Sequence, residues 1–96
     1  MKPDLKMPKI KIIYKKLGKE KAHGISYSDG EIFIDSRLKG KKKLEILIHE
    51  VLHLLNPMDS EETIVKKSVT LCKILWKEGY REIDNSEDVP LQDGSI

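Results

Sequence analysis

The chain has 96 residues, a formal net charge of +2 and one cysteine. This length is sufficient for one domain and too short for two of ordinary size. A single cysteine excludes an internal disulfide, and no apolar run reaches the roughly 18 residues that a transmembrane helix needs. The N-terminus lacks the apolar core of a secretory signal, so we expect a cytoplasmic protein with no membrane partner.

The charge is divided unequally between the two halves of the chain. Residues 1–50 carry a net charge of +6 and residues 51–96 a net charge of −4. A basic segment can bind nucleic acid, but this one has few aromatic side chains on which bases could stack. We therefore interpret the lysines as a solvated surface and do not expect a nucleic-acid partner.

Three short segments in the first part of the chain have the alternating, β-branched pattern of strands. They are residues 9–15, 22–28 and 31–35. Asp29-Gly30, between the last two segments, is a strong signal for a tight hairpin. We expect the three segments to form a small antiparallel sheet.

Two longer segments follow, and both have the features of helices. Residues 41–55 are rich in leucine and too long for a strand, and an Asn-Pro pair ends them. A second helix is expected to begin after Asp59 or Ser60, either of which can cap it, and to end before Gly79. Strands followed by helices predict an α+β fold in which the sheet packs on the first helix.

The first of these helices contains an HExxH motif, His49-Glu50-Val51-Leu52-His53. Residues four apart lie on one face of a helix, so both imidazoles can reach a single Zn²⁺ ion. Glu50 is offset from His49 by about 100°, which suits a carboxylate that acts on zinc-bound water instead of binding the metal. We predict one zinc per chain, held by His49 and His53, with Glu50 as the catalytic base.

The remainder of this helix favours a metal site over two ordinary surface histidines. Glu45, His49 and His53 form a polar stripe, and leucine, isoleucine and valine cover most of the other positions. We therefore expect the helix to be largely buried. Histidines on a buried helix are costly unless a ligand satisfies them, and a metal in a cleft would satisfy both.

A catalytic zinc usually has three protein ligands and one position for water. Asp59, Glu61 and Glu62 are the main candidates for the third ligand, and Cys72 and His23 are weaker ones. On the second helix Glu61 lies near the centre of the apolar face, whereas Glu62 lies at its margin. We predict that Glu61 is the ligand and keep Glu62 as the alternative.

HEVLH, followed by a short loop and Ser60-Glu61-Glu62, resembles the zincin metallopeptidases, and most of all the minimal gluzincins. The resemblance covers about residues 9–80. It implies a minimal zincin scaffold, in which a small sheet packs on an active-site helix and a second helix bears a glutamate ligand. It also implies that the protein can be isolated in a latent form, with a terminal segment in the cleft.

The expected function is zinc-dependent hydrolysis of an extended peptide or protein, with a zinc-bound water activated by Glu50. Residues 31–35 are the strand that we expect to pair with the substrate. Residues 1–80 would form the peptidase domain, and the acidic residues 81–96 a mobile tail or a segment that holds the site latent. The alternative is a zinc-stabilised module without turnover that binds a protein or nucleic acid. Nothing in the sequence indicates an oligomeric state.

Overall fold

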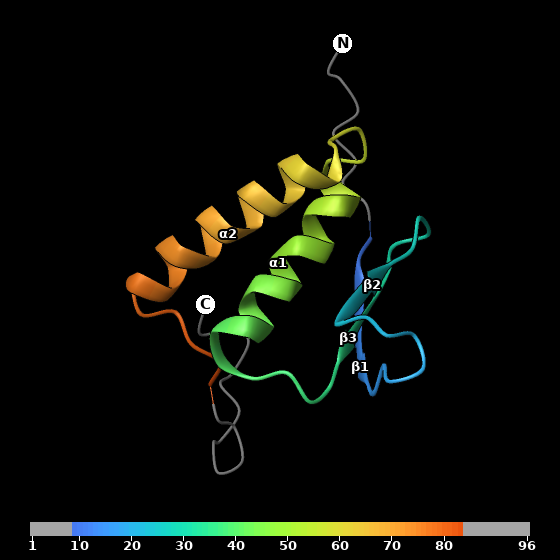
Figure 1. The fold of residues 1–96 in the computed structure, drawn as a ribbon, viewed down its shortest axis with the longest axis horizontal. Coiled ribbons are helices and arrows are strands. Elements are labelled where there is room, and N and C mark those ends of the chain that lie inside the picture. The colour runs from blue at the N-terminus through green and yellow to red at the C-terminus, as the bar shows by residue number, and fades with distance from the viewer. Residues whose placement is uncertain (1–8, 84–96) are drawn as a thin grey trace, which may run out of the picture.

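The computed structural model describes residues 9–83. The elements are β1 (Lys11–Lys15), β2 (Gly24–Ser26), β3 (Glu31–Asp35), α1 (Gly40–Leu55) and α2 (Glu61–Lys77). α1 lies between the sheet and α2 (Figure 1). The structure is therefore the small α+β unit that the sequence predicts, with α1 at its centre. Neither described helix combines the length and the apolar character that crossing a bilayer requires.

The sheet is mixed, so the prediction of an antiparallel sheet is wrong. Its strand order is β1-β3-β2, with β1 parallel to β3 and β2 antiparallel to it. β3 takes the centre and buries Ile32 and Ile34 completely. Because the chain reverses direction twice between β1 and β3, these two strands run the same way when they become neighbours. The expectation that residues 31–35 pair with a substrate is also wrong, because both edges of β3 are already hydrogen-bonded.

The connection between β2 and β3 is the predicted hairpin. Gly30 has a φ of 101°, a conformation that glycine adopts easily. Its N–H donates to the carbonyl oxygen of Tyr27 at 2.9 Å, and the N–H of Glu31 donates to Oδ1 of Asp29 at 3.0 Å. This turn sets β2 against β3 and leaves the other side of β2 as an edge of the sheet.

Asp35 holds the end of β3 where the chain turns toward α1. Its buried carboxylate accepts hydrogen bonds from the backbone N–H of Leu17 at 3.3 Å and of Arg37 at 2.9 Å. The guanidinium of Arg37 donates two more, at 2.9 and 2.6 Å. The side-chain hydrogen bonds from Arg37, which favour the charged form, are the main reason that the pKa of Asp35 lies well below its usual range. Asp35 therefore ties the β1–β2 connection to the end of β3.

The start and end signals of the helices are found where the sequence predicts them. Ser60 caps α2, since its Oγ accepts the N–H of Thr63 at 3.2 Å. Gly79, with a φ of 96°, follows α2, and α1 ends at Leu55. The short connection from α1 to α2 brings the first residue of α2, Glu61, beside the C-terminal half of α1.

α1 is only partly buried, whereas the sequence predicts a largely buried helix. Glu50 and Leu52 are its buried residues, and Leu55 is 41% exposed. The sheet covers one side of α1 and α2 covers another, and residues 9–83 contain no further element to enclose the rest. The predicted polar stripe of Glu45, His49 and His53 lies partly exposed on α1.

The first residues of the predicted tail pack on the domain. The Arg81 guanidinium stacks on the ring of Trp76, 3.5 Å from its centroid, and donates to the carbonyl oxygen of Trp76 at 2.6 Å. Glu82 forms an ion pair with Lys43 of α1 at 2.7 Å. The predictions of mobility and of latency fall mainly on residues 84–96, which lie outside the described residues.

Candidate metal centre

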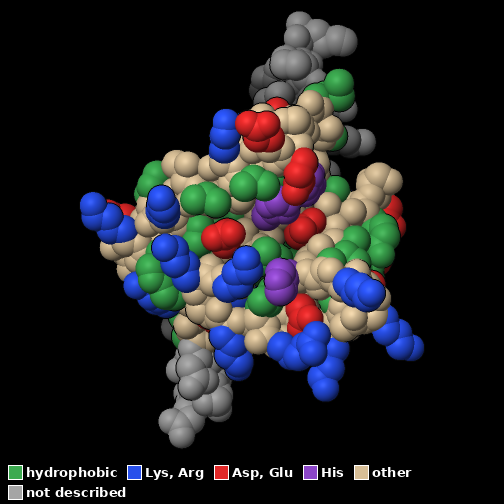
Figure 2. All heavy atoms as spheres, viewed as in Figure 1, with side chains coloured by type: hydrophobic (Ala, Val, Ile, Leu, Met, Phe, Trp, Pro, Cys, Tyr) green, Lys and Arg blue, Asp and Glu red, His purple; other side chains and the backbone are tan. Residues whose placement is uncertain are grey.

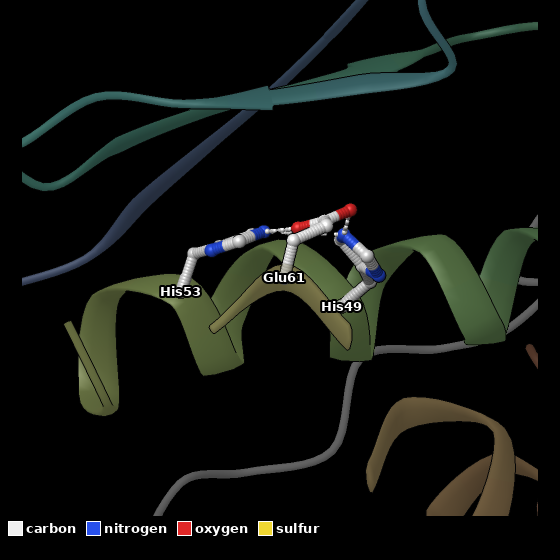
Figure 3. A group of neighbouring side chains, drawn as sticks. All are labelled: His49, His53 and Glu61. Atoms are coloured by element: carbon white, nitrogen blue, oxygen red, sulfur yellow. Dashed lines mark hydrogen bonds and ion pairs between the residues drawn. The ribbon is translucent and has the colours of Figure 1, made fainter. Parts of the chain in front are cut away.

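Three side chains converge beside the C-terminal half of α1 (Figure 3). The Nε2 atoms of His49 and His53, from successive turns of α1, are 3.2 Å apart. The carboxylate of Glu61, from the first turn of α2, lies 3.3 Å from Nε2 of His49 and 2.7 Å from Nε2 of His53. Although 66% of the Glu61 side chain is exposed, its carboxylate is turned toward both rings.

These donors suit a zinc ion in kind and in spacing. Two donors held about 2.0–2.1 Å from a tetrahedral zinc are roughly 3.3 Å apart. The 3.2 Å between the two Nε2 atoms and the 3.3 Å between His49 and Glu61 match this spacing. The 2.7 Å between His53 and Glu61 is shorter and is the length of a hydrogen bond. Two imidazoles and one glutamate form a donor set that catalytic zinc sites use. The residues present therefore fit the metal that the sequence predicts.

The local sequence explains why the three side chains meet. His49 and His53 are four residues apart, so their rings stack along one face of α1, with centroids 4.8 Å apart. The Ser60 cap begins α2 immediately before Glu61. In the space-filling view, histidine and acidic side chains gather at the surface over α1, between α2 and the sheet (Figure 2). The group is therefore accessible from solvent.

Glu50 lies apart from this group, between α1 and β2. It is 8% exposed, and its side chain packs against Gly24. Within residues 9–83, no hydrogen bond or ion pair engages its carboxylate. Gly24 of β2 leaves the space that this side chain occupies. Within the described part of the chain, packing between α1 and β2 is what places the carboxylate.

The other two acids considered as ligands have different partners. Asp59 forms an ion pair with Lys67 at 2.6 Å. Glu62 pairs with Lys66, one turn later on α2, at 3.2 Å. Neither belongs to the group formed by the two histidines and Glu61.

Cys72 and His23 also lie outside the group. Cys72 is buried between the helices, with its Sγ 3.5 Å from the carbonyl oxygen of Lys41. Burial raises the pKa of the Cys72 thiol, which disfavours the thiolate that binds metals. His23 is exposed immediately before β2. Cys72 is therefore a buried structural residue, and His23 is a surface residue.

Gly24 bears on the site and is not among the residues that the sequence predicts for it. It lies at the start of β2 and faces Ile46 and Glu50 of α1. An isolated glycine within a strand pattern often marks a close approach of another part of the chain. That signal is present between His23 and Ile25, but it does not say which part of the chain approaches.

Comparisons with known proteins do not assign the chain to a family. No family model matches it, and no curated protein and no solved structure matches it. The site is therefore interpreted from its own geometry and chemistry.

Proposed function

We propose that the chain is a zinc-dependent peptidase of the minimal zincin type, in which His49, His53 and Glu61 hold the metal and Glu50 is the general base. One observation carries the proposal. An acid from α2 turns toward both rings of an HExxH pair, and the donor spacing suits zinc. Two ordinary surface histidines would not require this arrangement.

A zinc ion held by these three residues would supply a Lewis acid that polarises a peptide carbonyl. Glu50 takes the proton from the attacking water and passes it to the leaving amine. One feature supports this role: the Glu50 carboxylate lies outside the donor set formed by His49, His53 and Glu61. Its neighbours on α1, His49 and His53, are fixed on the same rigid helix, which keeps base and ligands in a constant relation.

The position of β2 supports an extended peptide as the substrate. β2 is an edge strand, and in the described part of the chain only β3 pairs with it. At Gly24 this strand packs closely on Ile46 and Glu50 of α1. Extended peptides add to such edges through backbone hydrogen bonds. We propose β2, in place of residues 31–35, as the strand that receives the substrate.

The test is cleavage of a peptide mixture by zinc-loaded protein, with the fragments identified by mass spectrometry. We expect cleavage that stops with a chelator and returns when zinc is restored. The double variant His49→Ala/His53→Ala should neither bind zinc nor cleave. A wild-type protein that binds one zinc and cleaves nothing would favour the zinc-stabilised binding module, and a protein that binds no zinc would contradict both proposals.

A further inference from the structure

Gly24 is the point of closest approach between β2 and α1. A Cβ atom at this position would lie 2.8 Å from Cγ2 of Ile46 and 2.9 Å from Cγ of Glu50. It would also lie 3.2 Å from Oε2 of Glu50. Separations under 3.0 Å are essentially never found for real Cβ atoms. Gly24 is not among the glycines with positive φ, so its missing side chain provides space and not an unusual backbone conformation.

The space at Gly24 determines where the Glu50 carboxylate can lie. Among residues 9–83, Glu50 has no hydrogen-bond or ion-pair partner that would fix its side chain. Its side chain is nevertheless almost entirely covered. Packing between α1 and β2 is therefore what holds the carboxylate, and the strand can come this close only because residue 24 has no side chain.

We propose that Gly24 is a positioning residue for Glu50, an inference that rests on the proposed peptidase function. A methyl group at residue 24 forces one of two movements. Either the Glu50 side chain turns away from β2, or β2 moves away from α1. Both movements change the distance between the base and a peptide held on the edge of β2. A misplacement of about 1 Å can cost roughly 100-fold in rate.

The first experiment compares Gly24→Ala with Gly18→Ala. Gly18 is a matched control, because a Cβ there would meet only Nη2 of Arg37, at 3.9 Å. We expect Gly24→Ala to bind zinc normally and to lose about 100-fold in kcat. Gly18→Ala should retain the wild-type kcat. Wild-type kcat in Gly24→Ala would overturn the proposal.

The second experiment is a double-mutant cycle with Glu50→Ala, made in the Ile46→Ala background so that Glu50 is the remaining close contact of the new methyl group. If Gly24 acts through Glu50, then Gly24→Ala should not lower the residual kcat of Glu50→Ala any further. In metal-free protein, Gly24→Ala should also lower Tm less with Glu50→Ala than without it. If Gly24→Ala lowers kcat and Tm by the same amounts with and without Glu50→Ala, the role assigned to Gly24 is overturned.

The Ile46→Ala background removes the clash with Ile46. In Gly24→Ala/Ile46→Ala, compared with Ile46→Ala alone, the contact with Cγ2 of Ile46 is gone and the contact with Glu50 remains, so the loss of kcat should persist even where Gly24→Ala by itself folds poorly. Recovery of full kcat in the double variant would overturn the proposal. A wild-type protein that is fully loaded with zinc and inactive would overturn the proposed function, whereas an active wild type with independent effects overturns only the role of Gly24.

Discussion

The carboxylate of Asp35 is buried and accepts four hydrogen bonds, and it is ionised in the folded protein. Because Arg37 holds the pKa of Asp35 well below its usual range, the folded state binds this proton less readily than the unfolded chain does. The stabilisation from Asp35 is therefore fully present above the unfolded pKa of about 3.9, and it is lost as the pH falls toward the lowered folded pKa.

We predict that Asp35→Asn lowers Tm near neutral pH and flattens the dependence of Tm on pH in the acid range. The difference in Tm between wild type and variant should shrink as the pH falls below about 4. Thermal unfolding of metal-free protein between neutral and acid pH would measure this. Glu20→Gln, at an exposed position in the β1–β2 connection, is the control. A constant difference in Tm at all pH values would contradict the assignment.

At the scale of the element, the start of α2 decides which acid faces the histidines. Glu61 and Glu62 are adjacent, yet α2 turns the first toward the two rings and the second toward Lys66. The Ser60 cap fixes this rotation, because it sets the residue at which the helix begins.

Glu61→Ala should therefore weaken zinc binding far more than Glu62→Ala. Loss of an outer-shell partner typically costs about 10–100-fold in metal affinity, and loss of a direct ligand should cost more. Glu62→Ala should leave the affinity nearly unchanged. Competition with a chromophoric chelator measures both variants, and the reverse ranking would assign the metal to Glu62.

Local chemistry explains what could be predicted from the sequence. The HExxH spacing, the Ser60 cap and the Asp29-Gly30 turn each depend on residues within one or two turns of chain, and their geometry follows from adjacent side chains. The order of the strands does not follow from adjacent side chains. Nothing near residues 9–15 distinguishes a partner in β2 from one in β3, because that choice depends on which strand buries the most apolar surface.

Gly24 shows the same limit of prediction from local sequence. Its role depends on Ile46 and Glu50, which are more than twenty positions later in the chain. The pattern around residues 22–28 predicts a strand, but only the packing of β2 on α1 shows why one position of that strand has no side chain. The partial exposure of α1 does not follow from its sequence pattern for a related reason, since it depends on how many layers a chain of this length can build.

At the scale of the whole molecule, the structure is a thin arrangement of a sheet, α1 and α2 around a small core. Among residues 9–83 the fully covered apolar side chains are few: Leu17, Ile32, Ile34, Ile64 and Cys72. A domain of this size has a small margin of stability. A metal that links α1 to α2 through His49, His53 and Glu61 would add to that margin, because it binds only the folded arrangement.

Removal of zinc should therefore lower Tm. At a free zinc concentration of 100 times Kd, the stabilisation is about 2.7 kcal/mol, which corresponds to roughly 10–20 °C for a domain of this size. Differential scanning calorimetry with zinc and with a chelator measures the change. The His49→Ala/His53→Ala variant should show the same Tm in both conditions. An identical Tm for wild-type protein with and without zinc would contradict a metal bridge between the helices.

The most direct test of the proposed peptidase is the kcat of Glu50→Gln at matched zinc content. Glutamine has nearly the shape of glutamate but cannot accept the proton from water, so the base is removed and the packing against Gly24 is kept. We predict one zinc per chain in both proteins and a kcat for peptide cleavage that is lower by about 10²–10⁴-fold in the variant. A Glu50→Gln variant that retains its zinc and cleaves peptides at the wild-type rate would contradict the central claim.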